Sequence, residues 1–492
     1  MNLIKSLSEK LTRAVNNDWV VPKSGREKFL DRFYLFLLFV LCFIKLEPYI
    51  IPQLDDMTHA AMGISILQTG DWFTMHEGKM ISWLKPPLYF WIEAVLFKIF
   101  EPGEYWAKFP AALTGFLTFL FSYKTACKLF NRKVGFLTLF VLSTSLFFLR
   151  YTQRVMLDMP VAFAVTLGVF AVVEAQISKN KNYYFLFGLA AALGYYFKGM
   201  QGLYLFGIIP LYFVFTGQIK EIFSSRFLLS VLTAFTLIGL WFIPQYLTHG
   251  REFLLSQSGI GPLIYGGLPG YENPFYNPFK NLLRMFYWIL VSVYGMWIGI
   301  KELKNPVRKN SFIMLFSWFW TIMAALSISS VFGVRYFIPA LVPAGMFAAI
   351  GLEKVIKGKN FDYFHHAAVF FAAAILTIIA VFPMPPAKKG SKYISLYRCV
   401  NHIVDKKDKI ILYKDRQYIF NQGLVFYSRR PLDKQVRDLK ELKEEIKNTD
   451  KKIFIISTPQ DYGEIEQYFS KEKILKVASS GNWILFQIKD GY

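Results

Sequence analysis

The first residues able to do chemistry are two adjacent carboxylates and a lysine on one polar stretch. Asp55 and Asp56 stand in LDDMTHAAMG, and Lys85 stands in WLKPPLYFW. A carboxylate of such a pair can act as a general base and take a proton from a hydroxyl. Lys85 precedes two prolines that fix the local backbone, so its ammonium group is held in place and can neutralise a phosphate. The structural alternatives are a carboxylate that starts a helix and a lysine that reaches a lipid headgroup.

Three further polar stretches carry charges beside apolar segments. They are RYTQRVMLDMP with Arg150, Arg154 and Asp158, YYFKGMQG with Lys198, and FGVRYFIPALVP with Arg335 and Tyr336. Charges at such positions either pair with one another or serve a polar cavity, so an Arg–Asp pair within the first stretch is the structural alternative. All three stretches are expected on the same side of a membrane as Lys85. We therefore interpret them as parts of one site where carboxylates and cations converge.

Membrane-spanning helices are the elements that must position these residues. The chain has 492 residues, of which 54% are hydrophobic and only 18% charged, below the roughly 25% charge of soluble domains. Apolar runs near the length of a bilayer span recur along the chain. They predict an all-α polytopic membrane protein with about eleven spans. The expected spans are 33–51, 108–125, 134–150, 158–177, 183–197, 201–216, 227–247, 281–300, 311–329, 334–352 and 366–383.

Basic loops set the expected orientation in the membrane. Five loops between spans are rich in Lys and Arg, at 124–133, 178–182, 217–226, 301–310 and 353–360. The positive-inside rule places them in the cytoplasm together with residues 1–31, which puts the loop 52–107 outside. Within that loop the segment 87–100 is short and carries Glu93 and Lys98, so it is expected to be an interfacial helix. An odd number of spans puts the C-terminus on the outer face.

The composition changes after Pro383, where PMPPAKKG marks a linker. Short β-like runs follow at 409–415, 423–428, 452–458, 473–479 and 483–489, with a charged helical stretch at 433–448. Strands that alternate with a helix predict a small soluble α/β domain over 384–492, on the outer (periplasmic) face. Residues 1–383 would form the membrane domain. A second outer loop, 248–280, is long enough to cover a substrate.

The distribution of charge and of cysteine excludes some classes of protein. The formal net charge is +22, but the Lys and Arg residues are spread over short loops and form no nucleic-acid-binding motif. An anionic lipid is the expected partner instead. Cys42, Cys127 and Cys399 are far apart and lack the spacing of metal ligands. The first apolar run is not followed by the small-residue site of a cleavable signal peptide.

The motifs resemble those of polyprenyl-phosphate-dependent glycosyltransferases of the type-C membrane fold. The resemblance is carried by D-D-x-x-x-A from Asp55, then G-D-W, and then K-P-P-L-x-x-W from Lys85. WAKFPAALTGF, LDMP, FKG and RYFIPALVP follow in the same order, over roughly residues 33–383. The most similar branch contains bacterial lipid A aminoarabinose transferases and relatives of protein O-mannosyltransferases.

This resemblance implies an enzyme that passes a sugar from a polyprenyl-phosphate carrier to an acceptor hydroxyl at the outer face of a bacterial inner membrane. Asp55 would be the base or the group that orients the acceptor, beside Asp56 where the family more often has Glu. Asp158 would be a further acidic residue of the site. The residues that would bind and neutralise the lipid phosphate are Lys85, Lys198, Arg335 and Tyr336. The acceptor would be lipid A, another envelope glycan or a protein.

The resemblance also raises the question of a metal ion. Some aminoarabinose transferases bind a metal through a Glu just before the K-P-P lysine and a His in the large outer loop. Here position 84 is Leu, and the loop 248–280 has only His249 at its margin. No metal ligand and no cofactor are therefore assigned, and dependence on a divalent metal stays open. His59 and His76 are expected to be polar surface residues.

Two alternatives come from other functional classes. A transporter or flippase for a polyprenyl-linked glycan would be expected to show charges in mid-span or repeated halves, whereas here the charges gather in outer loops. A catalytically inactive scaffold, whose C-terminal domain binds a partner, would have no need of the Asp and Lys positions of the motif.

Overall fold

The computed structural model describes residues 25–44, 46, 55–78, 80–83, 85–258, 283, 286–328, 333–381, 391–414, 422–469, 473–480 and 483–488. Leu84, the predicted linker after Pro383 and most of the predicted loop 248–280 lie outside these residues. The chain forms two units. The first contains residues 1–44, 83–89 and 108–383, and the second contains residues 45–82, 90–107 and 384–492.

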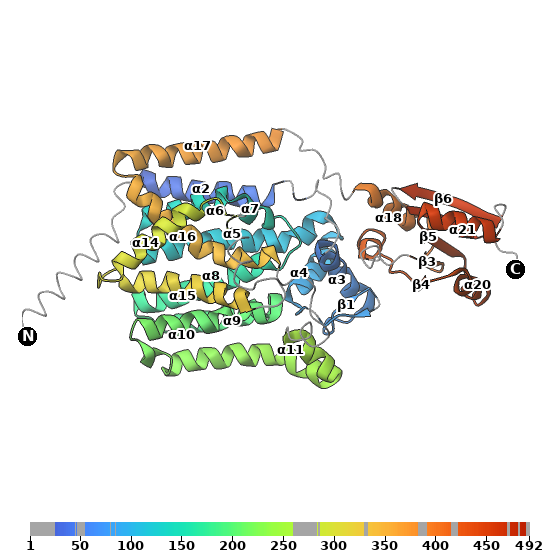
Figure 1. Cartoon of the computed structure of the whole chain (residues 1–492), viewed down its shortest axis with the longest axis horizontal. Coiled ribbons are helices and arrows are strands. Elements are labelled where there is room, and N and C mark those ends of the chain that lie inside the picture. Colours follow the sequence, from blue (N-terminus) through green and yellow to red (C-terminus); the bar gives the residue numbers. More distant parts are fainter. Residues whose placement is uncertain are drawn as a thin grey trace, which may run out of the picture. The chain divides into compact units, whose positions relative to one another are not determined.

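Helices that run side by side make up the first unit (Figure 1). In chain order they are α2 (Gly25–Phe43), most of α5 (Glu104–Leu129), α6 (Arg132–Thr144), α7 (Leu146–Tyr151), α8 (Asp158–Ser178), α9 (Tyr183–Lys198), α10 (Leu205–Phe215), α11 (Ser225–Ser258), α14 (Ile289–Glu302), α15 (Lys309–Ile328), α16 (Ile338–Val355) and α17 (Lys359–Val381). Short 3-10 turns, η1 (Gly199–Tyr204) and η3 (Val334–Phe337), precede α10 and α16.

Six helical segments in the described part of the chain are long and apolar enough to cross a membrane. They are Asp158–Ser178, Tyr183–Phe215, Ser225–Gln257, Lys309–Ser327, Val334–Val355 and Lys359–Val381. The predicted class, a helical membrane protein, is confirmed at this level. The segments Asp158–Ser178, which is α8, and Val334–Val355, which contains α16, are the most buried of the six. The segments of α11 and α17 are the least buried. The central pair therefore supplies the interior, and α11 and α17 present apolar side chains outward.

One of the predicted spans is interrupted, and another continues beyond its predicted end. The span 134–150 breaks at Ser145, between α6 and α7. The hydroxyls of Thr144 and Ser145 donate to the carbonyls of Phe140 and Val141, and such bonds compete with the regular helical pattern. The predicted span 227–247 continues instead as α11 to Ser258, with a kink at Gly250 (φ 61°).

The second unit contains the polar stretch that carries the Asp pair. It includes α3 (Asp55–Thr69), a two-strand hairpin of β1 (His76–Glu77) and β2 (Met80–Ile81), and most of α4 (Leu88–Phe100). The helix expected at 87–100 is therefore present as α4.

The C-terminal residues of the second unit form a five-stranded sheet in the order β4-β3-β5-β7-β6. Its elements are α18 (Ser391–Ile403), β3 (Lys409–Tyr413), the π-helical turn η4 (Leu424–Ser428), β4 (Lys434–Val436), α20 (Leu439–Lys447), β5 (Ile453–Ser457), α21 (Pro459–Phe469), β6 (Ile474–Ser480) and β7 (Trp483–Ile488). β3 is parallel to both β4 and β5, and β7 is antiparallel to β5 and β6. The small C-terminal sheet predicted from the sequence is confirmed.

Both faces of this sheet are covered by helices. Ile410 and Leu412 of β3 pack with α18 and η4, whereas Ile411 and Tyr413 pack with α20 and α21. The alternation follows from the two-residue repeat of a strand. The prediction of a strand at 423–428 was wrong, because Leu424, Val425 and Phe426 are all buried in one helical turn, and a short apolar run does not distinguish the two structures.

Candidate functional site

Four of the residues predicted for the site meet at the first turn of α8, and we call them the Asp158 cluster: Asp158, Lys198, Arg335 and Tyr336. Lys198 Nζ donates to Asp158 Oδ1, and Arg335 Nε lies 3.5 Å from Asp158 Oδ2. The ammonium of Lys198 also lies over the ring of Tyr336, 4.1 Å from its centroid, and the guanidinium of Arg335 lies 5.2 Å from the same centroid. Tyr336 therefore contacts both cations through its electron-rich face.

The elements that carry these side chains are buried, which keeps water from screening their charges. Asp158 is the first residue of α8 and is 2% exposed, and Lys198, the last residue of α9, is 9% exposed. Arg335 and Tyr336 lie in η3, immediately before α16. The side chain of Arg335 is the most accessible of the three charged groups, at 25%.

A tight turn after Lys198 fixes where its ammonium points. Gly199 has φ 67° and ψ −136°, a conformation that other residues adopt only with strain. η1 then folds back on α9 so closely that a Cβ on Gly194 would lie 2.6 Å from the carbonyl oxygen of Gly202. Only glycine at these positions allows the approach.

Lys85 belongs to the same unit and acts on the same cluster. Lys85 and Arg335 both repel the Lys198 ammonium electrostatically, whereas Asp158 attracts it. The K-P-P segment also lies near the turn after α9, because a Cβ on Gly199 would be 3.8 Å from Pro86 Cγ. Lys198 and Arg335 therefore contact the Asp158 carboxylate, and Lys85 acts on Lys198 from the K-P-P segment.

Two residues near the cluster were missed by sequence reasoning. Tyr204, the last residue of η1, interacts electrostatically with Asp158 and Tyr336. Gln257, near the end of α11, donates from Nε2 to the carbonyl of Trp83, two residues before Lys85, and accepts from Tyr195. Uncharged residues within apolar segments give no sequence signal, so spacing alone could not have found them.

Asp55 and Asp56 occupy the first turn of α3, in the second unit. Asp56 is fully buried and Asp55 is half-buried. Two carboxylates at this position are favoured by the partial positive charge of a helix N-terminus. The structural alternative of a helix start and the functional one of a base are therefore compatible.

The structure also describes the contacts of Arg154 and His59. The guanidinium of Arg154, one of the two arginines of the predicted Arg–Asp pair, lies over the ring of Tyr151, and Asp158 pairs with Lys198 and Arg335. His59 is 5% exposed and its ring packs against Phe90, so the expectation of a surface residue was wrong.

His76 pairs with Asp71 in the second unit, where Nε2 lies 3.1 Å from Oδ2. Burial opposes ionisation of Asp71, but hydrogen bonds from the backbone of Thr74, from His76 and from the backbone of Phe73 together lower its pKa. Within the described residues, no group of three or more His, Cys, Asp or Glu side chains could hold a metal ion.

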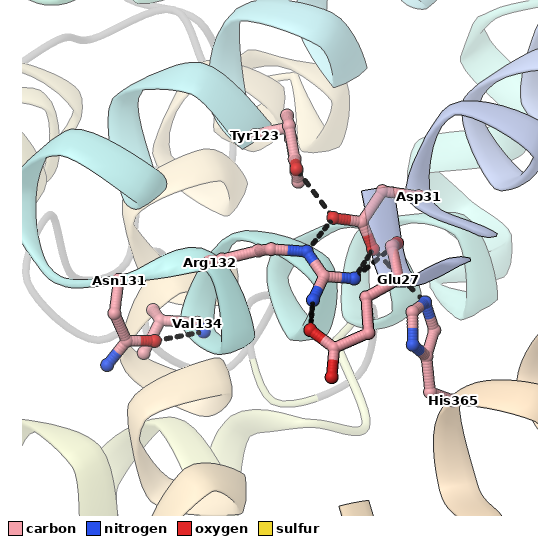
Figure 2. Close-up of polar contacts among 7 residues, drawn as sticks. All are labelled: Glu27, Asp31, Tyr123, Asn131, Arg132, Val134 and His365. Carbon is pink, nitrogen blue, oxygen red and sulfur yellow. Dashed lines mark hydrogen bonds and ion pairs between the residues drawn. The ribbon is translucent and has the colours of Figure 1, made fainter. Parts of the chain in front are cut away.

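A second group of polar residues, the Asp31 cluster, is buried elsewhere in the first unit: Glu27, Asp31, Tyr123, Arg132 and His365 (Figure 2). Asp31 Oδ2 accepts from Tyr123 at 2.6 Å and from Arg132 Nε at 2.5 Å. Its Oδ1 accepts from Arg132 Nη2 at 3.0 Å and lies 3.1 Å from His365 Nε2. Arg132 also pairs with Glu27. The cluster joins α2, α5, α6 and α17.

Comparison with known proteins agrees with the geometry. The family model described as "Dolichyl-phosphate-mannose-protein mannosyltransferase" matches residues 84–246, which include Lys85, Asp158 and Lys198. An uncharacterized protein of Aquifex aeolicus is 27% identical over 228 residues, 46% of this chain and 46% of that protein. The undecaprenyl phosphate-alpha-4-amino-4-deoxy-L-arabinose arabinosyl transferase 1 of Proteus mirabilis is 24% identical over 347 residues, 66% of this chain and 60% of its own.

Among solved structures, ArnT from Cupriavidus metallidurans bound to undecaprenyl phosphate matches with a TM-score of 0.74. The match covers 92% of this chain and 97% of ArnT, at 15% sequence identity. The chain has the ArnT fold. The resemblance inferred from the motifs is thereby confirmed, both in the family of mannosyltransferases that matches and in the aminoarabinose transferases to which the chain is similar. The chain spans 46% and 60% of the length of the two curated relatives.

Proposed function

We propose that this protein is a glycosyltransferase that moves a sugar from a polyprenyl-phosphate carrier to an acceptor hydroxyl at the outer face of a bacterial inner membrane. The observation that carries the proposal is the charge of the Asp158 cluster. There Lys198 and Arg335 both contact Asp158, and Lys85 lies near enough to act electrostatically on Lys198. Cations that converge at one place favour the binding of an anion. The Cupriavidus ArnT structure, bound to undecaprenyl phosphate, supports a lipid phosphate as that anion.

The cations have a direct role in the proposed reaction. When the acceptor oxygen bonds to the anomeric carbon, the bond from that carbon to the phosphate oxygen breaks, and its electron pair leaves with the phosphate. The released polyprenyl phosphate therefore gains negative charge. Lys198, Arg335 and Lys85 would stabilise this charge as it develops, which accelerates the step because the interaction is stronger in the transition state than in the bound donor.

The acceptor side of the reaction is assigned to α3. Asp55 would take the proton that the acceptor hydroxyl loses as its oxygen attacks, with inversion at the anomeric carbon. Asp56, which is fully buried, would orient its neighbour. Asp158 would act through the cations, since its carboxylate contacts Lys198 and Arg335. Tyr336 would hold the same two cations through its ring.

The proposal includes a membrane topology. Residues 1–383 would form the membrane domain with about eleven spans, as the apolar runs indicate. The N-terminus would be cytoplasmic, and the loop 52–107 and the domain 384–492 would lie on the periplasmic side. This arrangement would put the Asp pair and the phosphate-binding cations where a carrier lipid presents its sugar. The acceptor classes are lipid A, another envelope glycan and a protein.

Mass spectrometry of envelope glycolipids and glycoproteins tests the whole proposal. A deletion strain is expected to lack one sugar modification, which returns with the wild-type gene and not with Asp55→Asn, because the amide cannot accept the proton. An Asp71→Asn gene serves as the control, since Asp71 lies in the same polar stretch and pairs with His76. A modification that returns with Asp55→Asn would remove Asp55 from the reaction. An envelope unchanged by the deletion would contradict the transferase assignment.

The transporter alternative is not favoured, because the characterised relatives are transferases. Reconstituted vesicles separate the two activities. With a labelled polyprenyl-phosphate sugar and an acceptor on the same side, a transferase yields labelled acceptor and free polyprenyl phosphate. A flippase would instead move the intact labelled lipid to the other leaflet without any acceptor.

A further inference from the structure

The C-terminal domain holds the helix that carries the Asp pair. Both belong to the second unit, and η4 packs against α3. The contact is made by residues 422–429, a short segment that we call the clasp. Its polar contacts reach three places on the segment 55–102: the end of α3, the β1 strand and the residues after α4.

Arg429 makes two of these contacts. Its Nη2 donates to the carbonyl of Pro102 at 2.6 Å, and its own carbonyl accepts from Gln68 Nε2, near the end of α3, at 2.6 Å. Nη1 donates to the carbonyl of Phe426 within the clasp, and the guanidinium lies 5.6 Å from the centroid of the Phe426 ring. Arg429 has φ 59°, so its backbone is in the left-handed region that glycine adopts without strain.

Gln422 makes the third contact. This residue is fully buried, and its Nε2 lies 3.5 Å from Oε2 of Glu77 in β1. Oε1 of Glu77 accepts from the hydroxyl of Ser82 at 2.6 Å. The next residue in the hairpin, Gly78, donates its backbone N–H to Ser65 Oγ on α3 at 3.0 Å. The hairpin therefore connects the C-terminal domain to the side of α3.

α4 supports α3 near its middle. A Cβ on Gly63 would lie 2.8 Å from Glu93 Cβ, so the two helices approach closely there, and the rings of His59 and Phe90 pack 5.8 Å apart. With 1.5 Å of rise per residue, Asp55 lies about 12 Å from Gly63 along the helix and Gln68 about 8 Å on the other side. If α3 tilts about the Gly63 contact, any displacement at Gln68 appears at Asp55 enlarged by about half.

We propose that Arg429 is a positioning residue for the transfer reaction: its guanidinium fixes the clasp at Pro102, so that its carbonyl holds the end of α3 at Gln68 and thereby fixes the first turn that carries Asp55 and Asp56. The inference rests on the proposed function, in which Asp55 meets the acceptor. It gives the C-terminal domain a role in the chemistry.

Steady-state kinetics of the full-length enzyme test this role. Arg429→Gly removes the guanidinium without straining the backbone, and it is expected to lower kcat about tenfold or more, since small misplacements of a reacting group are costly. The KM for the polyprenyl-phosphate sugar should change by less than about twofold, because Lys198 and Arg335 are untouched. Arg429→Lys, which keeps a cation able to reach the Pro102 carbonyl, should recover part of the loss.

Arg430 provides the matched control. Its guanidinium donates to the carbonyls of Val404, Asp405 and Asp408, all inside the C-terminal domain. Arg430→Ala should therefore weaken that domain and leave kcat near the wild-type value. Wild-type kcat in Arg429→Gly, or an equal loss of kcat in both variants, would overturn the positioning role.

Hydrogen exchange tests the clasp without any turnover. Amides of Asp55–Thr69 should exchange faster in Arg429→Gly than in the wild type or in Arg430→Ala, because the clasp loses its guanidinium contact at Pro102, which keeps the Arg429 carbonyl in place against Gln68. Unchanged exchange in Arg429→Gly would refute the clasp even if transfer is observed. Conversely, a wild-type enzyme that transfers no sugar would refute the proposed function and the catalytic consequence, while exchange still decides whether the clasp holds α3.

Discussion

The Asp158 cluster and the Asp31 cluster are both buried groups of charges in the first unit, but their charges are balanced differently. In the Asp31 cluster two carboxylates share one arginine, a histidine and a phenol, and both oxygens of Asp31 have partners. In the Asp158 cluster two cations, Lys198 and Arg335, contact one carboxylate, and Lys85 acts on Lys198. The compensated charges of the Asp31 cluster join helices, whereas cations that converge, as in the Asp158 cluster, can receive an anionic ligand.

The chain also separates the two clusters in space. α6 begins at Arg132 of the Asp31 cluster, and α7 ends at Tyr151, shortly before Asp158. Twenty helical residues span about 30 Å, close to the thickness of the hydrocarbon core of a bilayer. The two clusters therefore belong to opposite ends of the same helical path. The Asp31 cluster joins helices, and the Asp158 cluster is the proposed phosphate-binding site.

The largest expected effect comes from breaking the compensated cluster. Arg132→Met removes the only guanidinium of the Asp31 cluster and leaves Asp31, which is 1% exposed, without its strongest partner. Loss of one member of a buried ion pair costs about 3–5 kcal/mol of stability. Thermal unfolding in detergent measures the loss, with the exposed Lys357→Ala as control. A melting temperature equal to that of the control would contradict the role of the cluster.

The second prediction is that removal of a cation from the Asp158 cluster weakens binding and not stability. Arg335→Gln should weaken binding of polyprenyl phosphate about 10- to 100-fold, because a charge-assisted hydrogen bond contributes about 1.5–3 kcal/mol. Stability should change little, since Asp158 keeps Lys198 as a partner. Arg150→Gln, in the same predicted outer loop as Asp158, is the matched control. If both variants bind the lipid equally well, Arg335 is not in the phosphate site.

A third prediction separates the cost of backbone strain, which lowers stability, from the displacement of Lys198, which lowers phosphate affinity. Gly199→Ala should cost about 1–3 kcal/mol of stability, because the residue would have to adopt a glycine conformation, and it should also weaken phosphate binding by displacing Lys198. Gly217→Ala imposes a similar demand at φ 73°, away from the site, so it should lower stability and leave affinity unchanged. Equal affinities for the two variants in a lipid-binding assay would show that the turn does not determine the position of Lys198.

The smallest effect is expected for Glu445, a carboxylate near water that is paired with Lys409 and Lys434. Hydrogen bonds from Lys434 and Lys409 lower the pKa of Glu445 from its ordinary value of 4.5, so this carboxylate stabilises the domain above that pH and ceases to do so as the pH falls below it. Glu445→Gln should cost about 1 kcal/mol or less at neutral pH. Hydrogen exchange of β3 and β4 should differ from the wild type at neutral pH and converge with it in acid. A difference that persists in acid would assign the effect to packing.

How far the sequence predicted these features depends on the kind of residue. Asp158, Lys198 and Arg335 could be found because a charge beside an apolar segment stands out. Tyr204 and Gln257 could not be found in this way, because neither carries a charge that distinguishes it from the residues around it. Arg132 was visible only as part of a basic loop, and His365 as part of an apolar helix, so their partnership with Asp31 depends on contacts across the fold.

In the C-terminal domain, the strength of the sequence pattern likewise decided which helices and strands could be predicted. Four of its predicted strands are present because their alternation or continuous burial matches a two-sided sheet. The helices α18 and α21 gave weaker patterns, and the apolar run of η4 was misread because burial on all sides removes the periodicity that distinguishes a turn of helix from a strand.

The main-chain contact between Gly194 and Gly202 has a consequence for affinity. Because backbone atoms, and not flexible side chains, set the path of the turn that follows Lys198, little conformational freedom is left for an incoming anion to remove. Preorganisation of this kind spares a ligand the entropy of assembling its own receptor. Tight binding could then be reached with few contacts, and association would be limited by how fast the lipid diffuses to the turn.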